Sequence, residues 1–174
     1  MQIEQTPLPG VLILTPARFG DERGFFSESW NRKLLAEHGI DLDFVQDNHS
    51  MSVAVNTLRG LHFQAPPHAQ DKLVRCGQGA LFDVAVDIRK GSPTYGQWFG
   101  TDLTAENGRQ LLVPRGFLHG FATRAERTEI YKARFLRTRI RWRGTLGQLR
   151  GRLGAERGAD PVRQGRRCGG AGGF

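Results

Sequence analysis

Hydrophobic and polar residues alternate along short segments throughout residues 1–132. Residues 81–88 place three branched apolar side chains on one face and two carboxylates, Asp83 and Asp87, on the other, because the side chains of a strand alternate with period two. Similar runs, bounded by Gly, Pro and Asn turns, predict strands at residues 11–15, 24–29, 44–55, 72–76, 81–88, 97–103, 110–113 and 117–123.

The spacing of these strands predicts an all-β fold. Many short strands at regular intervals favour a sandwich or a barrel, and a double-sheet jelly roll fits this pattern well. Only residues 31–38 have a helical pattern, in which Leu34 and Leu35 pack inward while the charged side chains face solvent. At 174 residues the chain is long enough for one domain with a buried core.

The apolar runs and the cysteine content indicate where the protein resides. No segment is apolar over the roughly 18 residues that a membrane helix needs, and the first residues have neither the basic nor the apolar region of a signal peptide. Two cysteines, Cys76 and Cys168, are too few for a disulfide framework and indicate a reducing compartment. We therefore expect a cytoplasmic protein with no membrane partner.

Charge is distributed very unevenly along the chain. Residues 133–174 contain eleven arginines but only two acids, Glu156 and Asp160, so this segment alone accounts for the net charge of +8. It is also rich in glycine and lacks apolar periodicity, which is typical of a disordered basic tail that could bind nucleic acid. The charge balance of residues 1–132 gives no such indication.

Candidate chemistry lies in two segments that contain histidine. In residues 57–66, Arg59 and His62 are three positions apart on a strand, which normally places two side chains on opposite faces. A bulge or kink at Gly60 would let both side chains enter one pocket. Residues 113–120 supply His119 behind a Pro/Gly turn. Together with Lys72, these residues indicate acid–base chemistry on an anionic ligand.

The pattern P-x-G-x-x-H at residues 114–119 resembles the second signature motif of the cupin jelly rolls. In most cupins the first motif has an H-x-H pair and a downstream Glu that bind a metal with the second-motif His. Here the corresponding residues are Leu61, His62 and Phe63, with no second His. Two histidines without a third ligand make a poor metal site, so we expect no metal and no other cofactor.

A narrower resemblance is to the dTDP-4-dehydrorhamnose 3,5-epimerases, a family of metal-free cupins. The residues that carry it include the R-G-L-H-F sequence, and they follow the order and spacing of the family over about residues 1–132. They are residues 21–28, 46–48, 58–63, 82–96 and 114–121 together with Lys72. The resemblance implies a cupin-type jelly roll, or double-stranded β-helix, that acts on a nucleotide-linked 4-keto-6-deoxy sugar.

The resemblance also implies roles for individual residues. The substrate's C3 and C5 protons flank a ketone, so removal of either proton gives an enolate, and reprotonation from the other face inverts the carbon. His62 matches the base, since a histidine titrates near pH ~6.5. Lys72 matches the group that stabilises the enolate, and Tyr131 matches the proton donor. Asp83 is a candidate partner for His62.

Other matches concern binding and assembly. Arg23, Gln46, Asn48 and Arg59 resemble contacts to the diphosphate and the sugar, where an arginine pairs well with phosphate oxygens. Glu28 resembles a contact to the thymine, and His119 resembles a residue of the sugar pocket. The resemblance further implies a homodimer in which the N-terminal strands of one subunit join the sheet of the other.

The resemblance stops after Lys132. When the codons for residues 134–138 are read from their second base, they can encode D-F-Y-A-P, the sequence with which the family continues. Two later stretches, read in the same shifted frame, can also encode the residues that the family has there. We therefore predict a domain over residues 1–132 that is incomplete at its C-terminus, followed by a frameshifted or disordered tail over residues 133–174. This change would remove the tyrosine that stacks on the thymine and an aspartate that pairs with the catalytic histidine, and we expect lower stability and activity. Tyr131 is also one residue short of the family spacing.

Two alternatives to the 3,5-epimerase remain open at this point. One is a related sugar-nucleotide enzyme that epimerises a single carbon or isomerises the keto group, since it would need the same base. The other is a non-catalytic jelly roll whose basic tail binds nucleic acid with a strong dependence on salt. We favour the enzyme and do not expect nucleic acid as a partner.

Overall fold

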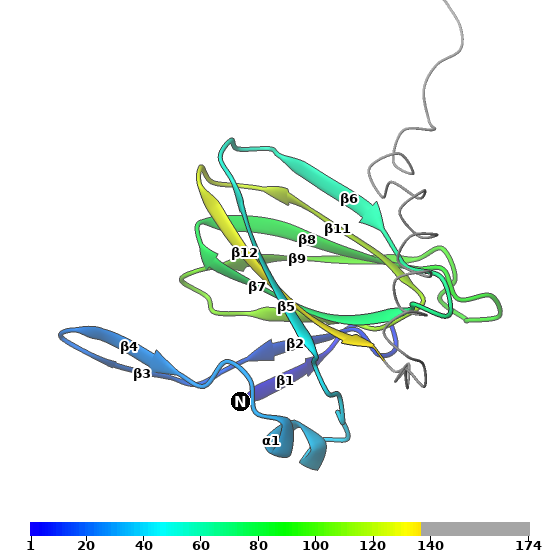
Figure 1. Cartoon of the computed structure of the whole chain (residues 1–174), viewed down its shortest axis with the longest axis horizontal. Helices are drawn as coiled ribbons and strands as arrows, with labels where there is room; N and C mark the ends of the chain where they lie inside the picture. The colour runs from blue at the N-terminus through cyan, green and yellow to red at the C-terminus, as the bar shows by residue number, and fades with distance from the viewer. Residues whose placement is uncertain (137–174) are drawn as a thin grey trace, which may run out of the picture. The chain divides into compact units, whose positions relative to one another are not determined.

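A computed structural model of the chain describes residues 1–136 (Figure 1). It contains one short helix, α1 (Arg32–Glu37), which begins at the N-cap Asn31. The strands are β1 (Gln2–Gln5), β2 (Leu12–Thr15), β3 (Arg18–Asp21), β4 (Gly24–Ser27), β5 (Gln46–Ser52), β6 (Leu58–His62), β7 (Gln70–Gln78), β8 (Ala80–Asp87), β9 (Trp98–Thr104), β10 (Gln110–Val113), β11 (Phe117–Thr123) and β12 (Thr128–Leu136).

Two antiparallel sheets form the body of the domain. A six-stranded sheet has the order β1-β2-β10-β7-β12-β5, and a four-stranded sheet has the order β6-β11-β8-β9. Strand β12 is thus paired on one side with β7 and on the other with β5. Because consecutive strands often belong to different sheets, the chain crosses repeatedly between the two layers, as in a jelly roll. The predicted all-β jelly roll is confirmed.

The main core lies between the sheets. Its buried residues come from both layers, for example Leu111 and Ile130 from one and Leu81 and Phe117 from the other. A second cluster joins Leu35 of α1 to residues of β2, β7 and β10 on the outer face of the six-stranded sheet. Strands β2 and β10 are therefore covered on both faces, which explains their unbroken apolar sequences.

Strands β3 and β4 form a separate hairpin that extends away from the two sheets (Figure 1). The Arg18 guanidinium holds its base by donating to the carbonyls of Ala105 and Glu106. Phe19 and Phe26 face each other across the hairpin, yet both side chains are about two-thirds exposed, at 67% and 71%. Apolar side chains exposed to this degree on a hairpin often mark a contact surface.

Several details differ from the predictions. The carboxylate face of β8 is the inward one, and Asp83 and Asp87 are both fully buried, because polar partners from other segments surround them. Strand β12 continues to Leu136, so regular structure passes the predicted boundary at residue 132. The remainder of the predicted tail, residues 137–174, lies outside the described part of the chain. In that described part, no helix is long and apolar enough to cross a membrane.

Candidate active site

A kink at Gly60 brings Arg59 and His62 to the same pocket. The pairing of β6 with β11 shifts register between His119 and Phe121, so that His62 lies opposite His119 while Arg59 lies opposite Phe121. Gly60 has a φ of +132°, and a Cβ built on it would lie 2.6 Å from the Gly120 Cα. Only glycine fits this crossing, and the predicted convergence of Arg59 and His62 is confirmed.

The pocket lies between the two sheets and has a volume of about 310 Å³. The four-stranded sheet contributes Arg59, His62, His119 and Phe121, whereas β5 and β12 of the six-stranded sheet contribute Asn48, Ser50, Ile130, Lys132 and Arg134. Four of the predicted site residues, Asn48, Arg59, His62 and His119, therefore meet here.

Lys132 and Arg134 were not among the predicted site residues. The signal that could have found them is the alternation of residues 130, 132 and 134 along one strand, which places all three on the same face. The resemblance to the family indicated Tyr131 instead, which the same alternation places on the opposite face of the strand. Both cations face the pocket in the structure.

Lys72 lies just behind His62. Its ammonium donates a hydrogen bond to the His62 backbone carbonyl at 3.3 Å, and the side chain is buried. The lysine therefore reaches from β7 of one sheet to β6 of the other and fixes a cation next to the histidine. Lys72 is not among the residues that line the pocket, and its predicted role of stabilising an enolate stays a prediction.

Asp83 is paired with His119 rather than with His62. The His119 Nε2 donates to the Asp83 Oδ1 at 2.6 Å, and both side chains are buried. The same oxygen accepts the Val84 backbone N–H. The expected Asp83–His62 pair is thus corrected, because β8 neighbours β11 and places Asp83 opposite Phe121, within reach of His119.

The pocket is rich in positive charge, and this affects its titratable groups. Partial burial lowers the pKa of His62 below its usual value, and the nearby Lys132 and Lys72 lower it further. Burial, with Lys132 and Arg134 nearby, lowers the pKa of Lys72 from 10.5 to about 8. Burial likewise lowers the pKa of Lys132. His62 is consequently neutral at pH 7, as a base must be.

The predicted binding residues near β5 are held by local hydrogen bonds. The Arg59 Nε donates to the Ser52 Oγ at 3.1 Å, which directs the guanidinium along β5. The Gln46 Nε2 donates to the Asn48 Oδ1 at 2.8 Å. Asn48 lines the pocket, whereas Gln46 lines a separate hollow with Trp30 and Arg75.

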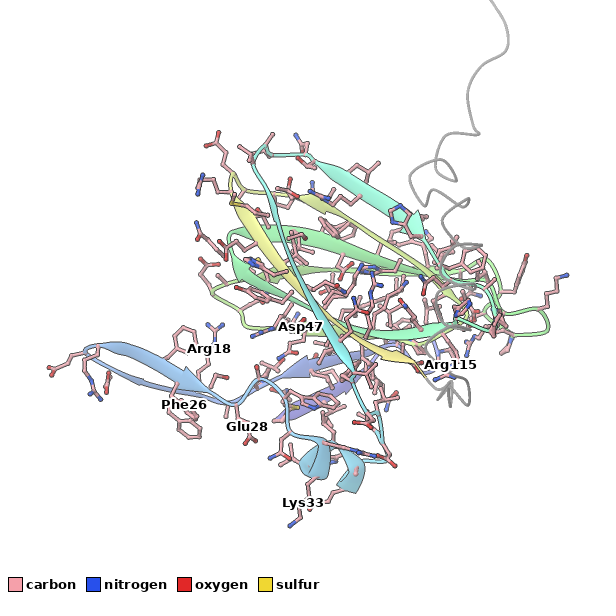
Figure 2. The ribbon with its side chains drawn as sticks, viewed as in Figure 1. Arg18, Phe26, Glu28, Lys33, Asp47 and Arg115 are labelled. Carbon is pink, nitrogen blue, oxygen red and sulfur yellow. The ribbon has the colours of Figure 1, made fainter. Side chains whose placement is uncertain are left out.

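Arg23 and Glu28 are not brought to this pocket within the chain. Arg23 is at the tip of the β3–β4 hairpin, where it forms an exposed ion pair with Asp21. Glu28 accepts a hydrogen bond from Asn31 at 2.9 Å, and Figure 2 shows it between the hairpin and α1. Their predicted contacts to the nucleotide stay predictions.

Tyr131 faces away from the pocket. Its ring is stacked on the His49 ring, with centroids 4.3 Å apart and planes at 4°, and the Arg75 guanidinium lies 4.6 Å from its centroid. Its neighbour Lys132 takes the inward position on β12. The structure therefore does not bring Tyr131 together with His62, and its predicted role as proton donor stays a prediction.

No group of three or more His, Cys, Asp or Glu side chains within residues 1–136 is placed to hold a metal ion. What the pocket offers instead is one uncharged imidazole, His62, surrounded by fixed cations. Such an arrangement can remove a proton and stabilise the anion that results, and it attracts a negatively charged ligand.

Comparison with known proteins extends this description. Residues 5–135 match the sequence model of dTDP-4-dehydrorhamnose 3,5-epimerase. The chain belongs to this family. A relative of that name from Salmonella typhimurium is 59% identical over 135 residues, which cover 76% of this chain and 73% of the relative. A relative of the same name from Shigella flexneri is 53% identical over 148 residues, covering 84% and 81%.

A solved structure of the epimerase family agrees with the fold. The dTDP-4-dehydrorhamnose 3,5-epimerase from Bacillus anthracis, crystallised with TDP and PPi bound, superimposes with a TM-score of 0.76 at 47% identity. The match covers 80% of this chain and 79% of that one.

Proposed function

We propose that this chain epimerises C3 and C5 of dTDP-4-dehydro-6-deoxy-D-glucose to give dTDP-4-dehydro-L-rhamnose, a step of dTDP-L-rhamnose biosynthesis. The observation that carries the proposal is the pocket in which His62 and Arg59 approach from one sheet while Lys132 and Arg134 approach from the other. Membership of the epimerase family supplies the substrate.

His62 acts as the base in this reaction. It removes the proton next to the 4-keto group, and its lowered pKa keeps the imidazole free to accept that proton at neutral pH. The Lys72 ammonium, fixed against the His62 carbonyl, offsets the charge that develops on the keto oxygen. Protonation of the enolate from the opposite face completes each inversion.

The cations Arg59 and Arg134 bind the diphosphate of the substrate, because guanidinium groups pair with two phosphate oxygens at once. Asn48 and His119 hold the sugar from either side of the pocket. The Asp83 carboxylate fixes the His119 ring by accepting its Nε2 proton, so the other ring nitrogen is left as an acceptor for a sugar hydroxyl.

A homodimer and a cytoplasmic location complete the proposal. The exposed Phe19 and Phe26, paired on one face of the hairpin, form an apolar surface with which a second copy of the chain could pair. Arg23 and Glu28, which lie on or beside this hairpin, would then stand at the interface. The small number of cysteines favours a reducing compartment.

Proton NMR in deuterated water tests the proposed reaction with the full 174-residue chain. Incubation with dTDP-4-dehydro-6-deoxy-D-glucose should introduce deuterium at both C3 and C5 and invert both carbons. Deuterium at C3 alone would instead indicate a single-carbon epimerase. The variant His62→Ala should lose exchange at both positions while still binding dTDP, and substantial residual exchange would remove His62 from the role of base.

A further inference from the structure

Arg59 reaches from one sheet to the other beside the pocket. It belongs to β6, the edge strand of the four-stranded sheet, yet its guanidinium contacts β5, the edge strand of the six-stranded sheet. The Arg59 Nε donates to the Ser52 Oγ at 3.1 Å, and the Nη2 donates to the Met51 carbonyl at 3.4 Å. The side chain therefore joins the two sheet edges at the pocket that it lines.

Ser52 supplies a buried hydroxyl on the inward face of β5. It shares this face with Asn48 and Ser50, which line the pocket, because alternate residues of a strand point the same way. Only 2% of Ser52 is exposed, whereas Arg59 is an exposed residue. The contact therefore attaches a long side chain, which solvent would otherwise leave free to move, to an acceptor fixed in the interior.

The backbones of both residues are held without this contact. Ser52 is paired with a residue of β12, and Arg59 is paired with a residue of β11. The turn between them is closed by Thr123, whose Oγ1 accepts the Thr57 N–H at 2.9 Å and donates to the Ala54 carbonyl at 2.8 Å. Loss of the Ser52 hydroxyl should therefore free the arginine side chain without displacing either strand.

The contact also determines which edge of the guanidinium is available to a ligand. A guanidinium has five N–H groups. Ser52 accepts the one on Nε, and the Met51 carbonyl accepts one on Nη2. The N–H groups that remain, on Nη1 and Nη2, lie at the far end of the side chain. Two such parallel N–H groups match two oxygens of a phosphate.

We infer that Ser52 is a positioning residue for substrate binding, which holds the Arg59 guanidinium with its Nη1–Nη2 edge toward the diphosphate. The inference rests on the proposed epimerase function, in which Arg59 binds that group. An arginine loses much rotational freedom when a ligand immobilises it. Because Ser52 already restricts the side chain, part of this loss does not occur on binding.

Ser52→Ala should raise the KM of the sugar nucleotide and the Kd of dTDP about five- to tenfold, the usual effect of having to immobilise one such side chain. The kcat should stay within about twofold, since the diphosphate is bound alike in the ground state and the transition state. Ser52→Thr keeps the hydroxyl, and it should bind dTDP within about twofold of the unaltered chain.

Thr15→Val is the matched control. Thr15 is on β2 of the same sheet as Ser52, and its buried hydroxyl has no hydrogen-bond partner within residues 1–136. The substitution should leave KM and Kd unchanged. The melting temperature of each full-length variant is followed by circular dichroism. A merely structural role of Ser52 would lower this temperature and would affect kcat as much as KM.

A double-mutant cycle tests whether Ser52 acts through the arginine. Arg59→Met removes the guanidinium, so Ser52 has no Nε to hold. In this background Ser52→Ala should have no further effect on the Kd of dTDP, measured by isothermal titration calorimetry. Equal effects of Ser52→Ala with and without Arg59 would show that the two residues act independently.

The positioning role of Ser52 would be overturned by that independence, by a Kd that Ser52→Ala leaves unchanged, or by Ser52→Thr binding as weakly as Ser52→Ala at an unchanged melting temperature. A fall in melting temperature with equal losses in kcat and KM would overturn it as well. An unaltered chain that does not bind dTDP would instead overturn the proposed function. Binding by the unaltered chain therefore distinguishes the two failures.

Discussion

Asp83 and His119 are joined by a 2.6 Å hydrogen bond between adjacent strands, with both side chains buried next to the substrate pocket. The imidazole N–H and the Val84 N–H both donate to the Asp83 Oδ1, whereas the buried Oδ2 has no hydrogen-bond partner among the described residues. Removing the charge should therefore affect the fold and the pocket together.

Asp83→Asn should lower the free energy of unfolding by about 2 kcal/mol, because the buried His119 N–H and the Val84 N–H lose the carboxylate oxygen that accepts them. Urea titration followed by circular dichroism measures the change. Asp102→Asn on β9 is the control, since that residue is exposed, and its effect should stay within about 0.5 kcal/mol. Equal effects of the two variants would contradict the importance of the buried pair.

Gly60→Ala should damage both stability and the site. Gly60 and Gly24 have nearly the same φ, +132° and +134°, but only Gly60 is close to another strand. Gly24→Ala should therefore cost about 1–2 kcal/mol of backbone strain. Gly60→Ala should cost about 2 kcal/mol more from overlap with Gly120, and it should slow His62-dependent exchange.

Thermal unfolding of the two glycine variants, together with deuterium exchange, separates strain from overlap. If Gly60→Ala proves no more harmful than Gly24→Ala, the close crossing of β6 and β11 is not what positions His62.

Lys72 should make stability depend on alkaline pH. Its pKa in the folded chain is about 8, compared with 10.5 for an ordinary lysine. Between these values the unfolded chain binds more protons, so the free energy of unfolding rises as pH increases from 8 to 10.5. The difference between the two pKa values corresponds to about 3 kcal/mol in the free energy of unfolding. Below pH 8 the lysine is charged in both states, and its burial exerts the full destabilising effect.

Lys72→Met should raise stability at pH 7 and reduce this rise with pH, although Lys132 contributes in the same direction. Urea unfolding at several pH values between 7 and 10 tests the slope. The exposed Lys90 provides a control, since Lys90→Met should leave the slope unchanged. A slope that Lys72→Met does not alter would contradict burial as the cause.

The hairpin should contribute to assembly. Replacing Phe19 and Phe26 with serine should weaken the proposed homodimer at least about tenfold, because exposed apolar pairs of this kind supply much of the energy of an interface. Sedimentation at several concentrations measures the dissociation constant. Trp98→Ser alters an aromatic residue of similar exposure, 64%, on β9, and it should leave assembly intact unless the interface lies elsewhere.

Local patterns predicted much of this structure correctly. The strands at residues 110–113 and 117–123 have the predicted bounds, because a period of two bounded by turn residues requires only neighbouring positions to read. The convergence of Arg59 and His62 was also predictable, since an odd spacing with a glycine between the two residues permits a kink.

The structural features that were predicted wrongly depend on side chains outside the strand pattern itself. The inward face of β8 is the acidic one, because His119 from the distant β11 receives Asp83, while Arg89, Ser92 and Thr94 from the turn that follows β8 receive Asp87. The choice between Tyr131 and Lys132 is likewise made by β7, where Gly77 leaves room for the ring. Pairing between remote strands leaves no trace in the local pattern.

Strand β12 occupies the gap between β7 and β5, although it is the last strand in the described chain. During synthesis, β5 and β7 therefore each have an unpaired edge until residues 128–136 leave the ribosome. Until then the sheet is incomplete, and the nascent chain exposes two strand edges whose unpaired backbone groups can pair with other chains. The nine residues of β12 thus decide whether β5 joins the sheet, since β1, β2, β10 and β7 pair with one another without them.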